Sequence, residues 1–167
     1  MQMKSSTVYG ATGSGGHNAA MVREPQLALA SGRTIAVYDL RVGAGGQLAP
    51  MVELNGHAAG VTTLSWVDGR HLFSGSFDGT IRLWSLQGHG TELRQLRVGD
   101  EGKVTGLVHV PPPHHGTVPV CNLYYGTGAG YSWNVKVENM GGDEVPAWVE
   151  SRQASVLEPL DDPFEFG

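Results

Sequence analysis

The chain has 167 residues, of which 40% are hydrophobic and 16% charged. This composition is sufficient for a hydrophobic core and excludes a chain that is disordered as a whole. Its 25 glycines and 9 prolines favour many short strands joined by turns over long helices. The single cysteine, Cys121, excludes an internal disulfide and a zinc finger, and no apolar stretch reaches the length of a membrane span, so we expect a soluble intracellular protein.

The net charge is unevenly distributed along the chain. Residues 1–137 carry 10 Lys/Arg and 8 Asp/Glu, a balance of +2, whereas residues 138–167 carry one Arg and 8 acidic residues, a balance of −7. Because the body of the chain is close to neutral, it has no long-range field that would attract a phosphate backbone. Bulk charge therefore gives nucleic-acid binding no support.

One segment of the chain recurs at a spacing typical of repeat proteins. The run TIAVYDL at 34–40 returns 46 residues later as TIRLWSL at 80–86. A weaker echo, YSWNV at 131–135, places Trp133 49 residues after Trp84. Three copies of one supersecondary unit are predicted.

The central copy predicts four short strands separated by turns. The predicted strands are 63–66, 71–76, 81–86 and 93–98. The dipeptide Asp78-Gly79 stands where a tight hairpin needs a positive φ. The third of these strands is apolar on both faces apart from Arg82, which is typical of a strand covered on two sides.

Four short antiparallel strands in about 45 residues, opened by Gly56-His57 and closed by Trp84-Ser85, resemble the WD-repeat family, whose fold is the β-propeller. The run from Leu54 through Trp84 carries most of the resemblance. Tyr38-Asp39 and Trp133-Asn134 stand at the closing position of two weaker flanking copies. The stretch from Leu54 to Trp133 is most similar to the C-terminal blades of plant-type zinc-finger WD-repeat proteins, without their zinc finger.

The resemblance implies an all-β fold of about three four-stranded antiparallel propeller blades over residues 26–137. Residues 1–25 are expected to be a flexible glycine-rich lead-in or partial strand, and residues 138–167 an irregular acidic tail. Within that tail, Pro146 and Pro159 bracket a predicted short helix.

Three blades are too few for a closed ring, because propellers close with about 4 to 8 blades. An open arc would leave blade faces in water. We therefore expect the missing blades to come from a longer chain, from partner subunits or from further copies of this chain.

The resemblance also implies a role for a set of polar residues that share the residue types of a catalytic triad. In the WD-repeat family these positions match a hydrogen-bonded tetrad that ties the outer turn of a blade to its middle strands. The four residues are His57, Ser74, Asp78 and Trp84. We expect them to be structural, and we expect no catalytic residue and no enzyme activity.

Two glycine-rich runs and one histidine cluster are interpreted as structural. The run 126–130 precedes a strand-like segment instead of a helix, so it is predicted to be a hairpin and not a dinucleotide loop; the run 10–16 lacks the Lys-Ser/Thr of a phosphate loop. His109, His114 and His115 surround prolines 111–113 in a predicted exposed loop, where nothing enforces the geometry of a metal site. No cofactor and no metal are expected.

The candidates for partner contact lie in the tail and in the histidine-containing loop. They are Trp148, Phe164, Phe166, His114 and His115. The segment Asp162-Pro163-Phe164 also resembles a short adaptor-binding motif of endocytosis. A tail packed on a neighbouring subunit is the interpretation we prefer.

The sequence thus predicts a non-catalytic WD-repeat scaffold subunit that contacts other proteins in a larger assembly and has no small-molecule substrate. The alternative is an RNA-associated structural subunit of a ribonucleoprotein particle, such as a ribosome or an RNA-processing particle. In that alternative RNA would be contacted by Arg41, Arg70, Arg82, Arg94 and Arg97.

Overall fold

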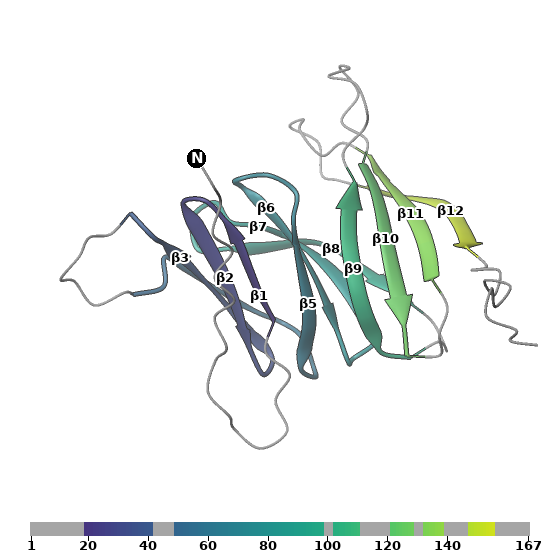
Figure 1. The fold of residues 1–167 in the computed structure, drawn as a ribbon, viewed down its shortest axis with the longest axis horizontal. Helices are drawn as coiled ribbons and strands as arrows, with labels where there is room; N and C mark the ends of the chain where they lie inside the picture. The colour runs from purple at the N-terminus through teal and green to yellow at the C-terminus, as the bar shows by residue number, and fades with distance from the viewer. Residues whose placement is uncertain are drawn as a thin grey trace, which may run out of the picture.

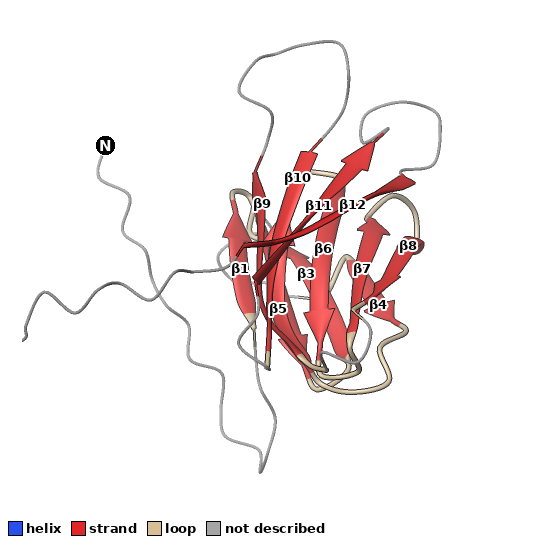
Figure 2. Cartoon of the chain, turned by 90° about the vertical axis from the view of Figure 1, so that its right-hand side faces the viewer, coloured by secondary structure: helices blue, strands red, loops and turns tan. Residues whose placement is uncertain are grey.

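The computed structural model describes residues 19–41, 49–98, 102–110, 121–128, 132–138 and 147–155. These residues form twelve strands and no helix, so the predicted all-β fold class is confirmed (Figure 2). Three four-stranded antiparallel sheets stand one beside the next along the long axis of the molecule (Figure 1). The described sheets form an open stack and do not close into a ring.

Each sheet is built from four strands that follow one another in the sequence. The first sheet consists of β1 (Ala20–Arg23), β2 (Gln26–Ser31), β3 (Thr34–Asp39) and β4 (Val52–Asn55). The second consists of β5 (Val61–Trp66), β6 (His71–Ser76), β7 (Thr80–Ser85) and β8 (Thr91–Arg97). The third consists of β9 (Val104–Val110), β10 (Cys121–Thr127), β11 (Ser132–Glu138) and β12 (Ala147–Ser155).

The strands of the second sheet lie close to their predicted positions. Strand β6 has the predicted limits, and β5, β7 and β8 differ from theirs by one or two residues. Gly79 has a φ of +75°, and its N–H donates to the carbonyl of Ser76 at 3.2 Å. The turn between β6 and β7 therefore uses the left-handed conformation that glycine adopts at low cost.

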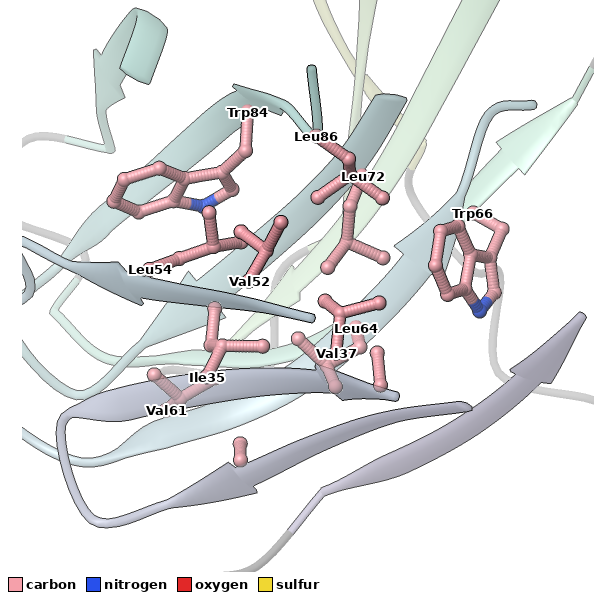
Figure 3. Packing of buried hydrophobic residues seen from close by; sticks show 12 residues of the cluster. Ile35, Val37, Val52, Leu54, Val61, Leu64, Trp66, Leu72, Trp84 and Leu86 are labelled. Atoms are coloured by element: carbon pink, nitrogen blue, oxygen red, sulfur yellow. The ribbon is translucent and has the colours of Figure 1, made fainter. Parts of the chain in front are cut away.

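The second sheet is covered on both faces, by the first sheet on one and the third sheet on the other. Because successive residues of a strand point to opposite sides, its inner strands β6 and β7 contribute to both cores. Leu72 and Trp84 belong to a core shared with the first sheet, whereas Phe73 and Leu83 belong to a core shared with the third sheet. Figure 3 shows the first of these cores, with side chains from the two sheets pointing toward one another. Apolar burial between neighbouring sheets is thus the main contact that joins the stack.

Strand β5 also contacts both neighbouring sheets through polar groups. The Val61 N–H donates to the carbonyl of Gly32 at 2.7 Å, and the Thr62 hydroxyl donates to the carbonyl of Val104 at 2.6 Å. These bonds join the start of β5 to the first sheet on one side and to the third sheet on the other. Strand β5 is accordingly in contact with both β1 and β9.

The predicted helix between Pro146 and Pro159 is wrong, because strand β12 occupies this part of the chain. Residues 147–155 form an extended strand that pairs antiparallel with β11. An isolated helix of about 11 residues is marginal in water, whereas the free edge of β11 offers a row of backbone donors and acceptors. The sheets therefore run from Ala20 to Ser155, beyond residues 26–137 at both ends.

A glycine permits a close approach between the second and third sheets. A Cβ added to Gly75 would lie 2.5 Å from Cγ1 of Val104 and 2.8 Å from Cγ2 of Thr63. Both distances are far below van der Waals contact. A side chain at this position would therefore push β9 away from β6.

We predict that Gly75→Ala lowers the free energy of unfolding by about 1–3 kcal/mol, because overpacking forces the two sheets apart. Gly106→Ala is the matched control, since Gly106 also lies in a strand and a Cβ there meets nothing within 4 Å. The control is expected to stay within about 0.5 kcal/mol of the wild type. Urea unfolding of the two variants checks this, and equal stabilities would contradict it.

Candidate functional site

The four residues of the predicted tetrad lie together around β6 and β7, the two inner strands of the second sheet. His57 lies in the loop between β4 and β5, Ser74 on β6, Asp78 in the turn between β6 and β7, and Trp84 on β7. Gly56 lets this loop approach the sheet, because a Cβ there would lie 3.1 Å from Cη2 of Trp84. The loop that leaves the first sheet is thereby brought onto the second sheet.

A continuous chain of hydrogen bonds joins these side chains. The Trp84 indole N–H donates to Oγ of Ser74 at 2.8 Å. Oγ of Ser74 lies 2.7 Å from Nε2 of His57, and Nδ1 of His57 lies 2.9 Å from Oδ2 of Asp78. With the proton on Nδ1, His57 donates to the carboxylate and accepts from the serine hydroxyl, so every donor finds an acceptor.

Asp78 is the main acceptor of the network. Its carboxylate accepts from the Ala58 N–H at 2.8 Å, from the Thr80 N–H at 2.9 Å and from the Thr80 hydroxyl at 2.5 Å, in addition to His57. Thr80 is a member that the sequence interpretation missed. Its signal is the hydroxyl two residues after an aspartate in a turn, where Asp side chains commonly bind the following backbone.

Burial and hydrogen bonding move the pKa values of the two titratable members. Burial lowers the pKa of His57 below its usual value, against the opposing effect of Asp78. Partial burial alone would raise the pKa of Asp78, but hydrogen bonds from Thr80, His57 and Ala58 outweigh it and lower this pKa to about 2. At neutral pH the network therefore joins a neutral histidine to a charged carboxylate.

The buried state of the network decides what it can do chemically. The side chain of His57 is 0% exposed and that of Asp78 is 8% exposed, while Ser74 is 0% exposed. The Ser74 oxygen also accepts from Trp84, which a nucleophile poised for attack would not do. The arrangement binds the loop, turn and strands to one another and gives a substrate no access to the serine.

The structure describes only some of the remaining candidate residues. Trp148 lies on β12, opposite Val137 of β11 in the register. Phe164, Phe166, His114 and His115 lie outside the described residues. His109 lies on β9, half-buried, where its backbone N–H donates to Oγ of Ser65 at 3.1 Å.

Two further expectations concern glycines and metals. Strand β10 ends at Thr127 and pairs antiparallel with β11, as in a hairpin, and residues 129–130 of the predicted turn lie outside the described residues. Within the described parts of the chain, no group of three or more His, Cys, Asp and Glu residues could hold a metal ion. A search of the described residues also finds no helix long and apolar enough to cross a membrane.

Comparison with known families places this network within a recognised repeat. The family description "WD domain, G-beta repeat" matches residues 48–85. These residues form a WD40 repeat. No curated protein matches the chain.

The WD40 repeat does not coincide with one sheet. It begins before β4 of the first sheet and ends at Ser85 of the second sheet, so it contains β4, β5, β6 and β7. All four tetrad residues lie within it. The repeat therefore includes strands from both sides of the interface between the first and second sheets. Its His57 network binds the loop after β4 to the second sheet.

We predict that Asp78→Asn lowers the free energy of unfolding by about 1–3 kcal/mol, because an amide cannot accept at all the positions that the carboxylate fills. Glu53→Gln is the control, since Glu53 is exposed on β4. Urea unfolding at neutral pH measures both variants. An Asp78→Asn protein as stable as Glu53→Gln would contradict the structural role of the network.

We also predict that stability falls as the pH falls below about 6.5, because unfolded histidine binds a proton there while buried His57 does not. His109, whose pKa is also lowered by burial, contributes in the same window. A second loss is expected between about pH 4 and pH 2, where Asp78 is protonated in the unfolded chain but charged in the folded one.

The measurement is urea unfolding of the wild type and of His57→Gln across this pH range. In the variant, the free energy of unfolding is expected to depend less steeply on pH near pH 6, because only the contribution of His109 remains. Identical slopes for the two proteins would show that His57 does not titrate as its burial implies.

Proposed function

We propose that this chain is a non-catalytic WD-repeat scaffold subunit that contacts other proteins within a larger assembly. WD40 repeats generally mediate contacts between proteins, and one such repeat occupies residues 48–85. The polar network inside it is buried and internally satisfied, so it supports a structural role for the repeat.

One observation carries the proposal. The second sheet is buried on both faces, but no described strand covers the outward faces of the first and third sheets. Apolar side chains are exposed at both ends of the stack, including Val22 at 51% and Val108 at 57%. Exposed apolar surface on a sheet favours contact with another protein surface.

The missing blades have three candidate sources. A longer chain, partner subunits or further copies of this chain would each place a sheet on the open faces. We favour completion by a longer chain or by a partner. The finer resemblance to zinc-finger WD-repeat proteins, which covers Leu54 to Trp133, remains part of this proposal.

Two of the arginines that would serve an RNA-associated role are paired with carboxylates. Arg41 forms an ion pair with Asp39, and Arg82 forms one with Glu92. These pairs reduce the positive charge that is available to a phosphate backbone. We therefore do not advance RNA association as a second function.

The tail supplies the most direct test of the scaffold role. We predict that Phe164→Ala combined with Phe166→Ala reduces recovery of the bound proteins by about tenfold or more, because buried aromatic anchors dominate interface energies. Glu165→Gln is the matched control within the same segment. The tagged full chain is recovered from its source cells, and its mass is measured by size-exclusion chromatography with light scattering.

The expected result is a defined complex heavier than the 17.7 kDa chain, with fixed proportions of other polypeptides and unchanged by ribonuclease. Loss of this complex on ribonuclease treatment, with steep weakening by salt, would favour the RNA alternative. Recovery of the chain as a stable monomer would contradict the scaffold proposal.

A further inference from the structure

The chain holds a single asparagine that is followed directly by a glycine, in the dipeptide Asn55-Gly56. Asn55 is the last residue of β4, an edge strand that pairs only with β3 among the described strands. Both residues of the dipeptide are exposed. The next residue is His57, which the polar network holds against the second sheet. The chemistry of this dipeptide therefore bears on the interface between the first and second sheets.

An asparagine that precedes a glycine can lose its side-chain amide without an enzyme. The backbone nitrogen of the glycine gives up its proton and attacks the side-chain carbonyl carbon of the asparagine. A new carbon–nitrogen bond forms, the bond to the side-chain nitrogen breaks, and that nitrogen leaves as ammonia. The product is a five-membered succinimide ring. Glycine favours the ring closure, because it has no Cβ to hinder the attack and adopts unusual backbone angles at low cost.

Water opens the succinimide ring at either of its two carbonyl carbons. Opening at the carbon that came from the side chain restores the ordinary backbone and leaves an aspartate. Opening at the backbone carbon leaves an isoaspartate, whose main chain runs through the former side chain. Either route consumes one water and releases one ammonia overall, with no oxidant or reductant. Solvent supplies the water, because both residues are exposed.

The surroundings of the Asn55 amide assist the first step of this reaction. The Thr34 hydroxyl donates to Oδ1 of Asn55 at 2.9 Å, so a donor already faces the oxygen on which negative charge develops during the attack. The side-chain nitrogen, which leaves as ammonia, has no hydrogen-bond partner among the described residues. The end of an edge strand frays at low cost, which allows the backbone to reach the ring-closing conformation.

The glycine of this dipeptide is required by the packing of the repeat. A Cβ at Gly56 would lie 2.6 Å from Nη1 of Arg82 and 3.1 Å from Cη2 of Trp84. Any side chain at this position would therefore push the loop away from the second sheet. The steric constraint that requires glycine at position 56 also makes Asn55 reactive.

The two products of the reaction have different consequences for the network. Isoaspartate adds one methylene group to the main chain, a length of about 1.5 Å. Only Gly56 lies between the strand pair that Asn55 forms with Thr34 and the buried ring of His57. The extra length therefore breaks either the strand pair or the bonds of His57. Aspartate keeps the chain length, and its exposed side chain leaves the network intact.

We propose that Asn55-Gly56 is a self-modification site, at which conversion to isoaspartate, assisted by the Thr34 hydroxyl, releases the His57 loop from the second sheet. The reaction consumes only water and runs in one direction. It gives the WD40 repeat a lifetime that is set by its own sequence. The inference does not rest on the proposed scaffold function, because no partner takes part.

The first measurement is the rate at which Asn55 loses its amide in the purified full chain at neutral pH. Peptide mass spectrometry follows the conversion, and Asn122 in the same sample is the internal control, because Leu123 follows it. Asn55 is expected to react at least about tenfold faster than Asn122, since a following side chain hinders ring closure. Equal rates for the two residues would overturn the site.

The role of Thr34 is tested by the same measurement on Thr34→Val. The variant is expected to slow the reaction of Asn55 about threefold or more in the folded chain, because valine has no donor for Oδ1. In concentrated urea the variant and the wild type are expected to react at the same rate. A folded variant that reacts as fast as the wild type, or faster, would overturn the assistance by Thr34.

The release of the loop is tested on aged protein. Anion exchange isolates the deamidated chain, which carries one additional negative charge, and fragmentation by electron transfer measures its isoaspartate content. Freshly made Asn55→Asp is the matched control, because it has the same charge and the ordinary backbone. Asn55→Gln, aged in the same way, is expected to yield no such fraction, since its longer side chain would have to close a larger ring.

The deamidated fraction is expected to consist mainly of isoaspartate and to melt about 5 °C or more below Asn55→Asp. Its Trp84 indole N–H, which donates to Ser74, is expected to exchange with solvent at least about tenfold faster than in the control. A fraction that contains no isoaspartate would overturn the inference. An isoaspartate-rich fraction that melts and exchanges like Asn55→Asp would overturn it as well.

Discussion

The architecture depends on burial of apolar side chains between neighbouring sheets. A four-stranded sheet with large apolar residues on both faces needs a neighbour on each side, and the second sheet has both. Apolar area removed from water is the dominant favourable contribution to folding. Among the described strands, the first and third sheets each gain this contribution on one face, and the stack stays open at both ends.

The polar network adds specificity to this apolar stack. His57 follows the last strand of the first sheet by two residues, yet it bonds to Ser74 and Asp78 of the second sheet. The WD40 repeat therefore contains strands of two sheets and not of one. If the loop moved away from the second sheet, buried polar groups would lose their hydrogen-bond partners. Gly56 permits the close approach of this loop to Trp84, and Gly75 permits the close approach of Val104 from the third sheet.

The second sheet and its network were the parts most open to prediction from sequence. There, strand alternation, the Asp78-Gly79 turn and the tetrad that the WD-repeat resemblance implies all indicate one structure. Prediction failed at β12, because two prolines bracket a segment whose conformation is decided by pairing with the preceding strand, β11, and the helix signals of the prolines do not report that pairing. Thr80 was missed since a hydroxyl in a turn is common, and its bond to Asp78 becomes visible only in three dimensions.

The most direct test of the account is native-state hydrogen exchange of the full chain, measured for each strand. If sheet-on-sheet burial controls stability, the amides of β6 and β7 exchange most slowly, and those of β2, β3, β9 and β10 exchange faster because one face of each sheet is open. Equal protection across the three sheets would contradict the claim that the first and third sheets depend on neighbours beyond the described chain.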